Sequence, residues 1–188
     1  EFDRNLGQEP LNVYAQTKAE AEALLAQAEG VRTNNYRLGY VCGDSRTGSF
    51  QKAIDKNGLY LILRALYEMA QLPTTDIGFW EFTTVDQIAK QWIAIMSHPE
   101  LLDNTFHLLN GHSVGISQLK RAFRAIGRNH PEVDSDSFMD YMYDNYEGPP
   151  TSQYVRDFLL HSHLLAAPGL SRMAVQTGWT TAVLEKLD

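Results

Sequence analysis

The sequence predicts a layered α/β fold that is followed by a mostly helical subdomain. Helical and extended patterns alternate from Tyr14 to Gly127, which is typical of helices that cover a sheet. From residue 131 onward the patterns are helical and no convincing strand is present. The chain has 188 residues, of which 44% are hydrophobic and 21% charged. This is an ordinary globular composition, and a chain of this length can bury a core without metals or disulfides.

Charge and cysteine content exclude several classes of protein. The net charge is -7 and the basic residues do not cluster, which argues against a nucleic-acid or anionic-membrane surface. No apolar run is long enough to span a bilayer, and no signal peptide opens the chain. The single cysteine, Cys42, permits no internal disulfide and suits the cytoplasm. The first residue is Glu1 and not Met, so we expect a piece of a longer protein.

The first elements are a helix, a strand and a loop. The Ala-, Glu- and Leu-rich segment from Tyr14 to Gln27 predicts a helix that is closed by Gly30. In the next segment, Tyr36, Leu38 and Tyr40 alternate with other residues at the period of a strand. A polar loop then follows, with Gly43, Asp44, Ser45, Thr47 and Gly48.

Further alternation follows this loop. Residues 58–71 predict a helix that stops before Pro73, and residues 77–82 a short extended segment. Thr84 and Gln87 form a capping box for a helix that ends near Pro99. Residues 105–109 predict a strand. Ser117 is the expected cap of the next helix, which ends before Gly127. The apolar face of this helix comprises Leu119, Phe123 and Ile126.

The tail begins with an acidic, aromatic helix at residues 135–146. Its apolar side chains are at helical spacing and favour a core-packing stripe over a ligand pocket; they are Phe138, Tyr141, Met142, Tyr143 and Tyr146. We therefore place a boundary near residue 128. Residues 1–128 form the α/β part, with a helical insertion at about 51–76, and residues 129–188 form the helical subdomain.

Tyr14 and Lys18 stand four residues apart on the first predicted helix, so their side chains share one face. A phenol is a weak acid, but a neighbouring ammonium stabilises the phenolate and makes the phenol a better proton donor. Such a pair can protonate a carbonyl oxygen while hydride reaches the carbonyl carbon. Spacing alone makes this a weak motif.

A competing motif is the GxSxG segment centred on Ser113, which lies between a predicted strand and helix as a hydrolase nucleophile does. Asp134 and His161 are the available acid and base, but they fall in predicted helices. A turn with two glycines and a surface serine is the favoured interpretation. The glycines of residues 43–49 lack the lysine of a phosphate loop, and no metal motif accompanies His161 and His163, so no metal site is expected.

Three strings together resemble a known family. Tyr14-Ala-Gln-Thr-Lys18 is followed by Arg37-Leu-Gly-Tyr-Val-Cys-Gly-Asp-Ser-Arg-Thr-Gly48, and later by Val85-Asp-Gln-Ile-Ala89. These strings resemble extended short-chain dehydrogenases and, more narrowly, the thioester reductase domains of nonribosomal peptide synthetases, polyketide synthases and carboxylic acid reductases. The resemblance covers roughly residues 9–128.

The resemblance implies the C-terminal part of a Rossmann-like NAD(P)-binding sheet with an appended, mostly helical substrate subdomain. It implies NADPH as cofactor, and a carrier protein whose phosphopantetheine thioester is reduced to an aldehyde or an alcohol. Tyr14 would donate the proton and Lys18 would hold the nicotinamide ribose. Four consecutive residues would face the nicotinamide: Leu38, Gly39, Tyr40 and Val41. The loop residues Gly43, Asp44, Ser45, Thr47 and Gly48 would border the substrate.

The sequence departs from this family in three places. Leu38 stands where the family has proline. The glycine fingerprint that seats the pyrophosphate and the catalytic Ser or Thr are both missing, so we expect them upstream of Glu1, together with most of the NADPH site. The fragment alone is therefore expected to be inactive. Two alternatives stay open: a thioesterase-like hydrolase that uses Ser113, and a non-catalytic segment that docks a carrier domain through residues 129–188.

Overall fold

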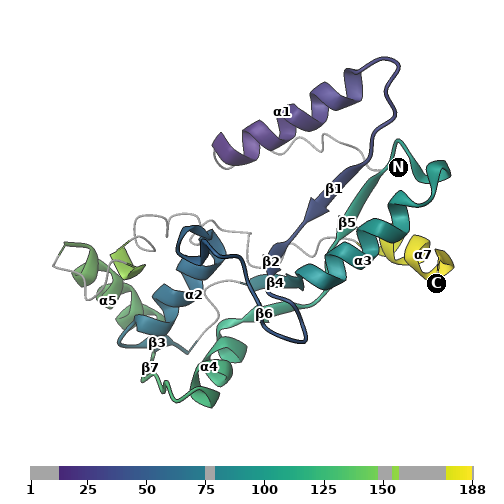
Figure 1. The fold of residues 1–188 in the computed structure, drawn as a ribbon. Coiled ribbons are helices and arrows are strands. Elements are labelled where there is room, and N and C mark those ends of the chain that lie inside the picture. Colours follow the sequence, from purple (N-terminus) through teal and green to yellow (C-terminus); the bar gives the residue numbers. More distant parts are fainter. Residues whose placement is uncertain (1–12, 75–78, 148–153, 157–176, 188) are drawn as a thin grey trace. The chain divides into compact units, whose positions relative to one another are not determined.

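The computed structural model of the chain describes residues 13–74, 79–147, 154–156 and 177–187 (Figure 1). The chain divides into two compact units. The first unit comprises Glu1–Gly39, Asp86–Leu109 and Val175–Asp188, and the second comprises Tyr40–Val85 and Asn110–Ala174. The fold is mixed α/β, as predicted.

The first unit is built on two parallel strands. Strand β1 (Asn35–Leu38) pairs with β5 (Thr105–Leu108), in register from Asn35 opposite Thr105 to Leu38 opposite Leu108. Helices α1 (Val13–Gln27), α3 (Val85–Met96) and α7 (Gly178–Leu187) accompany them, with a short 3-10 turn at Pro99–Leu101. The parallel pairing of strands from distant parts of the chain agrees with the predicted sheet.

Apolar side chains from the strands and helices form the core of the first unit. Phe106 and Leu108 of β5 are fully buried, as is Ile95 of α3. Tyr36 of β1 stacks on Phe106 with 5.9 Å between ring centroids and meets Trp92 edge-on at 5.8 Å. These contacts hold α3 against β1 and β5.

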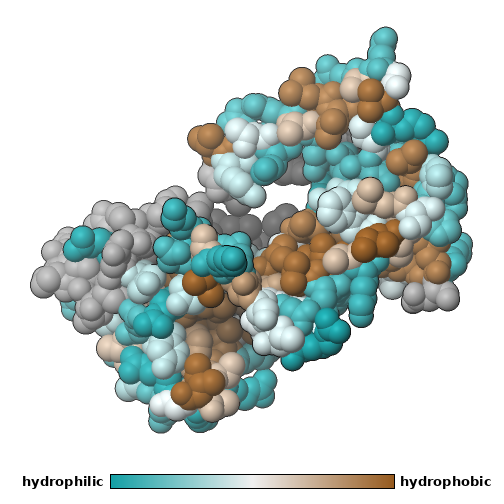
Figure 2. Space-filling view, viewed as in Figure 1, coloured by the Kyte–Doolittle hydropathy of each residue, from teal (hydrophilic) through white to brown (hydrophobic). Residues whose placement is uncertain are grey.

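Helix α1 forms as predicted, but it buries none of its side chains. The chain leaves it through Gly30, whose φ of 73° is the left-handed conformation expected after a helix. Its apolar residues lie on the surface: Leu24 is 69% exposed and Leu25 is 43% exposed. Figure 2 shows hydrophobic (brown) surface over α1, at the top of the view.

The second unit contains a three-stranded sheet in the order β2-β4-β6. Strand β4 (Phe79–Thr84) lies in the centre, parallel to β2 (Tyr40–Cys42) and antiparallel to β6 (Ser113–Gly115). A second, short parallel pair joins β3 (Leu72–Pro73) to β7 (Glu132–Val133). The helices are α2 (Gly58–Glu68), α4 (Ile116–Ala125) and α5 (Ser135–Glu147), and a 3-10 turn lies at Ile54–Lys56.

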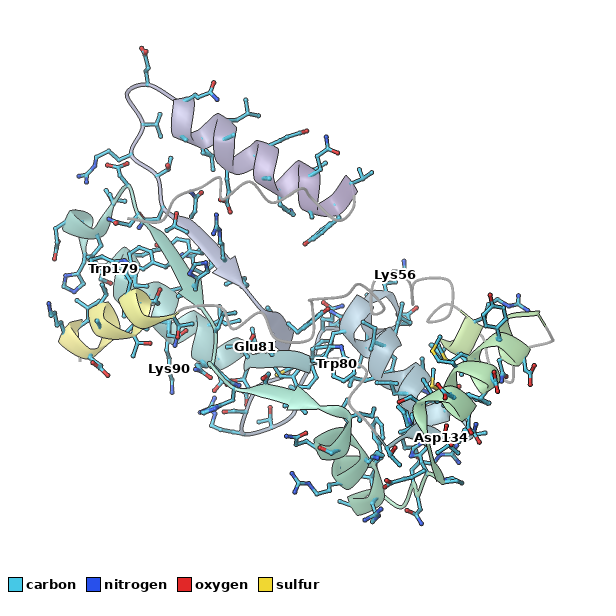
Figure 3. The ribbon with its side chains drawn as sticks, turned by 180° about the vertical axis from the view of Figure 1, so that it is seen from behind. Lys56, Trp80, Glu81, Lys90, Asp134 and Trp179 are labelled. Carbon is cyan, nitrogen blue, oxygen red and sulfur yellow. The ribbon has the colours of Figure 1, made fainter. Side chains whose placement is uncertain are left out.

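One hydrophobic cluster forms the core of the second unit. Trp80 of β4, labelled in Figure 3, lies in it with 2% of its surface exposed. The helices contribute most of the remaining buried members, which include Ala65, Leu66, Met69, Ile116, Leu119, Phe123, Phe138 and Met142. The predicted core role of Phe138 and Met142 is confirmed, whereas Tyr143 is 67% exposed and the Tyr146 side chain lies outside the described residues.

Three local predictions differ from the structure. The predicted single strand breaks at Gly39, because β1 pairs with β5 while β2 pairs with β4. Helix α4 begins after Gly115, whose N–H donates to the Gln118 side chain at 3.0 Å, so Ser117 is not the cap. Strand β7 lies in the tail, where no strand was predicted. The boundary near residue 128 stays a prediction; in the division into two compact units, α7 belongs to the first unit.

Candidate functional site

Tyr14 and Lys18 lie one turn apart in the first half of α1, and the structure brings their side chains together. The Lys18 Nζ atom lies 5.3 Å from the centre of the Tyr14 ring. Both side chains are exposed, with Tyr14 at 72%. The exposed phenol and ammonium can both reach a bound molecule, which is the property that a proton donor and a ribose-binding cation need.

The structure also contains an ion pair that the sequence patterns did not predict, between Glu22 of α1 and Arg37 of β1. Glu22, one turn after Lys18, receives two hydrogen bonds from Arg37 of β1. The Nε–Oε1 distance is 3.0 Å and the Nη2–Oε2 distance is 2.6 Å. These hydrogen bonds raise the pKa of Arg37, although burial opposes part of the effect. Spacing offered one signal, since Tyr14, Lys18 and Glu22 are four residues apart and share a face.

The residues expected to face the nicotinamide span the change from β1 to β2. Leu38 ends β1 and is 49% exposed, and Tyr40 begins β2 and is also exposed. Partial burial of the phenol raises the pKa of Tyr40. Gly39 and Val41 are half-buried. An exposed apolar side chain and a glycine next to it suit contact with a flat aromatic ring, and the role of all four residues stays a prediction.

The loop after β2 is closed by the Asp44 carboxylate. Asp44 Oδ1 accepts hydrogen bonds from the N–H groups of Arg46 and Thr47, each at 3.0 Å, and from the Thr47 hydroxyl at 3.0 Å. These bonds lower the pKa of Asp44, the two backbone N–H groups contributing most. The Gly48 N–H also donates to the Asp44 carbonyl at 2.8 Å.

Two glycines in this loop are required by its shape. A Cβ atom at Gly43 would lie 2.9 Å from the carbonyl oxygens of Gly48 and Ser49, which is closer than real contacts allow. Gly48 has a φ of 67°, which other residues rarely adopt. The closed loop presents Ser45, Arg46 and Thr47 to solvent. The structure thus brings the predicted substrate residues together in one turn, with Asp44 directed inward.

Comparison with known proteins finds a matching family model, similar sequences and similar folds. Residues 1–92 match an NAD-binding family described as "Male sterility protein". The chain is 26% identical over 134 residues to a linear gramicidin synthase of Brevibacillus parabrevis and 28% identical over 155 residues to the L-2-aminoadipate reductase large subunit of Penicillium chrysogenum. These alignments cover 70% and 79% of this chain. A thiolation-reductase di-domain from an archaeal nonribosomal peptide synthetase superposes on 96% of this chain, with a TM-score of 0.77 and 21% identity.

The predicted resemblance to these reductase domains is confirmed. The reductase-domain fold is shared with the archaeal di-domain, and it is of the Rossmann-like type. The chain spans 3% and 11% of the two curated relatives and 37% of the di-domain. The 188 residues therefore correspond to only part of each of these proteins.

Within this reductase-domain fold, Ser113 does not occupy a nucleophile elbow. It lies in β6, paired with Glu81 of β4, whereas an elbow requires a sharp turn between a strand and a helix. Asp134, the candidate acid labelled in Figure 3, instead caps α5: its carboxylate accepts from the Ser137 N–H at 2.9 Å and from the Ser137 hydroxyl at 2.8 Å. His161 and His163 lie outside the described residues.

Neither a metal site nor a membrane span is found within the described ranges. Among the side chains that the structure describes, no group of three or more His, Cys, Asp or Glu residues could hold a metal ion. No helix in the described part of the chain is long and apolar enough to cross a membrane.

Proposed function

We propose that the chain is the C-terminal part of an NADPH-dependent reductase that releases an acyl or peptidyl thioester from a carrier protein as an aldehyde or alcohol. The observation that carries this proposal is the pairing of Tyr14 and Lys18 on α1, with Nζ 5.3 Å from the ring centre, in a chain with the fold of a reductase domain. The names of the relatives, a gramicidin synthase and an aminoadipate reductase, support the substrate class.

The residues of this chain suit a nicotinamide cofactor. The Lys18 ammonium lies over a ring face and has no carboxylate partner among the described ion pairs, so its N–H groups can donate to ribose hydroxyls. Leu38, Gly39, Tyr40 and Val41 would line the nicotinamide. The cofactor supplies the hydride when it is bound.

The proposed reaction is hydride addition to the thioester carbonyl carbon. Tyr14 donates its phenolic proton to the carbonyl oxygen, and the Lys18 charge stabilises the phenolate that remains. The resulting hemithioacetal breaks its carbon–sulfur bond to release the aldehyde, while the thiol stays on the carrier arm. We further propose that the loop from Gly43 to Gly48 borders the thioester and that residues 129–188 face the carrier protein. We place the reaction in the cytoplasm.

The test is thioester-dependent NADPH oxidation by the complete gene product, with an acyl-pantetheine thioester as substrate. Tyr14→Phe should lower kcat by about a hundredfold or more, because the proton donor is lost. Tyr60→Phe, which removes a half-buried phenol on α2 outside the proposed site, is the control and should leave the rate unchanged. The 188-residue chain by itself should show no oxidation.

Two other outcomes would support the alternative functions, hydrolysis and carrier docking. Thiol release without nicotinamide, with Ser113 labelled by a fluorophosphonate, would establish hydrolysis and refute reduction. Binding of an isolated carrier protein without turnover, lost when residues 129–188 are deleted, would leave only a docking function.

A further inference from the structure

The attachment of α1 to the first unit depends on polar contacts. No side chain of α1 is buried, and only Ala15 and Glu22 are half-buried, which places them on the side of the helix that faces the strands. The larger apolar residues Leu24 and Leu25 lie at the surface. A helix of this length gains most of its stability from packing, so few apolar contacts constrain the position of α1.

The Glu22–Arg37 pair joins α1 to β1. It has the two-bond geometry in which a guanidinium binds a carboxylate most specifically. Its side chains are 24% and 36% exposed, so water screens the pair less than it screens an ion pair on an open surface.

His107 of β5 completes the arrangement. It lies directly opposite Arg37 in the parallel register, and its Nε2 atom is 3.5 Å from Arg37 Nη1. Burial, and then the nearby Arg37 charge, lower the pKa of His107, so the ring is neutral at pH 7. A neutral ring adds no second positive charge beside the Arg37 guanidinium.

We propose that Glu22 and Arg37 are positioning residues that hold α1, and with it Tyr14 and Lys18, at a fixed place on β1. Glu22 follows Lys18 by one turn, and Arg37 immediately precedes Leu38, where the expected nicotinamide-facing residues begin. The pair therefore couples the helix that carries the proton donor to the strand that leads to the cofactor. This inference rests on the proposed function for its role in catalysis but not for the contact itself.

The first experiment measures position directly, in the 188-residue chain and without turnover. Spin labels at Ala23→Cys and Ser97→Cys, exposed sites in the first unit, report the distance between α1 and the end of α3 in a Cys42→Ser background. Glu22→Gln should broaden the distance distribution about twofold, because the helix loses its ionic attachment. Glu20→Gln is the matched control, since Glu20 is exposed and bonds only to Gln16 within the described part of α1.

Two further variants test whether the Glu22–Arg37 pair holds α1 in place. The double exchange Glu22→Arg with Arg37→Glu should restore a narrow distribution. If the variant with the exchanged pair does not fold, Arg37→Lys provides the test instead. It retains the charge but loses the two-bond geometry, so it should broaden the distance distribution. Equal widths for Glu22→Gln and Glu20→Gln would overturn the proposal.

The second experiment tests catalysis in the complete gene product. Glu22→Gln should lower kcat about tenfold with little change in KM for the thioester, because the proton donor is misplaced while substrate contacts remain. Restoration of kcat by the double exchange supports a positioning role, and an unchanged kcat refutes it. If the wild type reduces no thioester, the proposed function fails, while the distance measurement still decides whether the pair positions α1.

Discussion

The Asp44 carboxylate organises the loop after β2, because it accepts hydrogen bonds from residues of that same loop. Its Oδ1 atom accepts from two backbone N–H groups and one hydroxyl, all within residues 46–47. This leaves little capacity to bind a substrate directly. The exposed members of the loop, Ser45 and Thr47, are therefore the better candidates for substrate contact, and Asp44 sets their positions.

The loop should open in acid. Because hydrogen bonds to its carboxylate lower the pKa of Asp44, the loop is most stable above the ordinary aspartate value of about 3.9 and loses that stability as pH falls through the lowered value. The amide NMR signals of Arg46 and Thr47 should therefore shift together, with a midpoint below about 3.9. Asp44→Asn should abolish this transition. A midpoint at or above the ordinary value would contradict the proposed hydrogen bonding.

At the scale of elements, the end of helix α2 is held by a side chain that follows α4. The Arg128 guanidinium donates to the carbonyl oxygens of Tyr67 at 3.0 Å and Met69 at 2.9 Å. Carbonyl groups in the last turn of a helix have no partner within the helix, and Arg128 supplies donors to them. His130 Nε2 also lies 3.0 Å from the Tyr67 oxygen, so Arg128 shares that carbonyl with His130. This contact links two helices that are distant in sequence.

Arg128→Met should destabilise the second unit by about 1 to 3 kcal/mol, because it removes the charged donor from half-buried carbonyls. Urea unfolding measures this change. Arg121→Met, at an exposed position of α4, is the matched control and should change the free energy of unfolding by less than about 0.5 kcal/mol. Equal effects of the two substitutions would show that Arg128 does not act through the end of α2.

At the scale of the whole molecule, the last helix returns to the unit that contains the first strand. Thr180 of α7 is 3% exposed, and its hydroxyl accepts from the His107 N–H of β5 at 2.9 Å. Val183 of the same helix is buried as well. The tail of the chain thus contributes to the first unit, beside the strand pair β1–β5.

Thr180→Val keeps the shape of the side chain but removes this acceptor, so we expect a loss of about 1 to 3 kcal/mol from the first unit. Thr181→Val, at the exposed neighbouring position, is the control and should be nearly neutral. Hydrogen exchange at β1 and β5 separates the two variants, with faster exchange expected only for Thr180→Val. Unchanged protection of these strands would show that α7 does not stabilise them.

Local patterns in the sequence predicted a helix from Tyr14 to Gln27, observed as Val13–Gln27, and a strand at residues 105–109, observed as Thr105–Leu108. They also predicted the close approach of Tyr14 and Lys18. Helical periodicity and a four-residue spacing are set by neighbouring residues, so they could be recognised without the fold. The resemblance to reductase domains likewise came from short strings of residues.

Tertiary structure decided the features that join distant segments. The change of strand partner at Gly39 could not be predicted, because one alternation of side chains runs through β1 and β2 alike. The Glu22–Arg37 pair and the contact of Thr180 with His107 each require two segments to fold together. Polar partners distant in sequence leave no periodic signal, and here they attach the helix of Tyr14 and Lys18 to its strand.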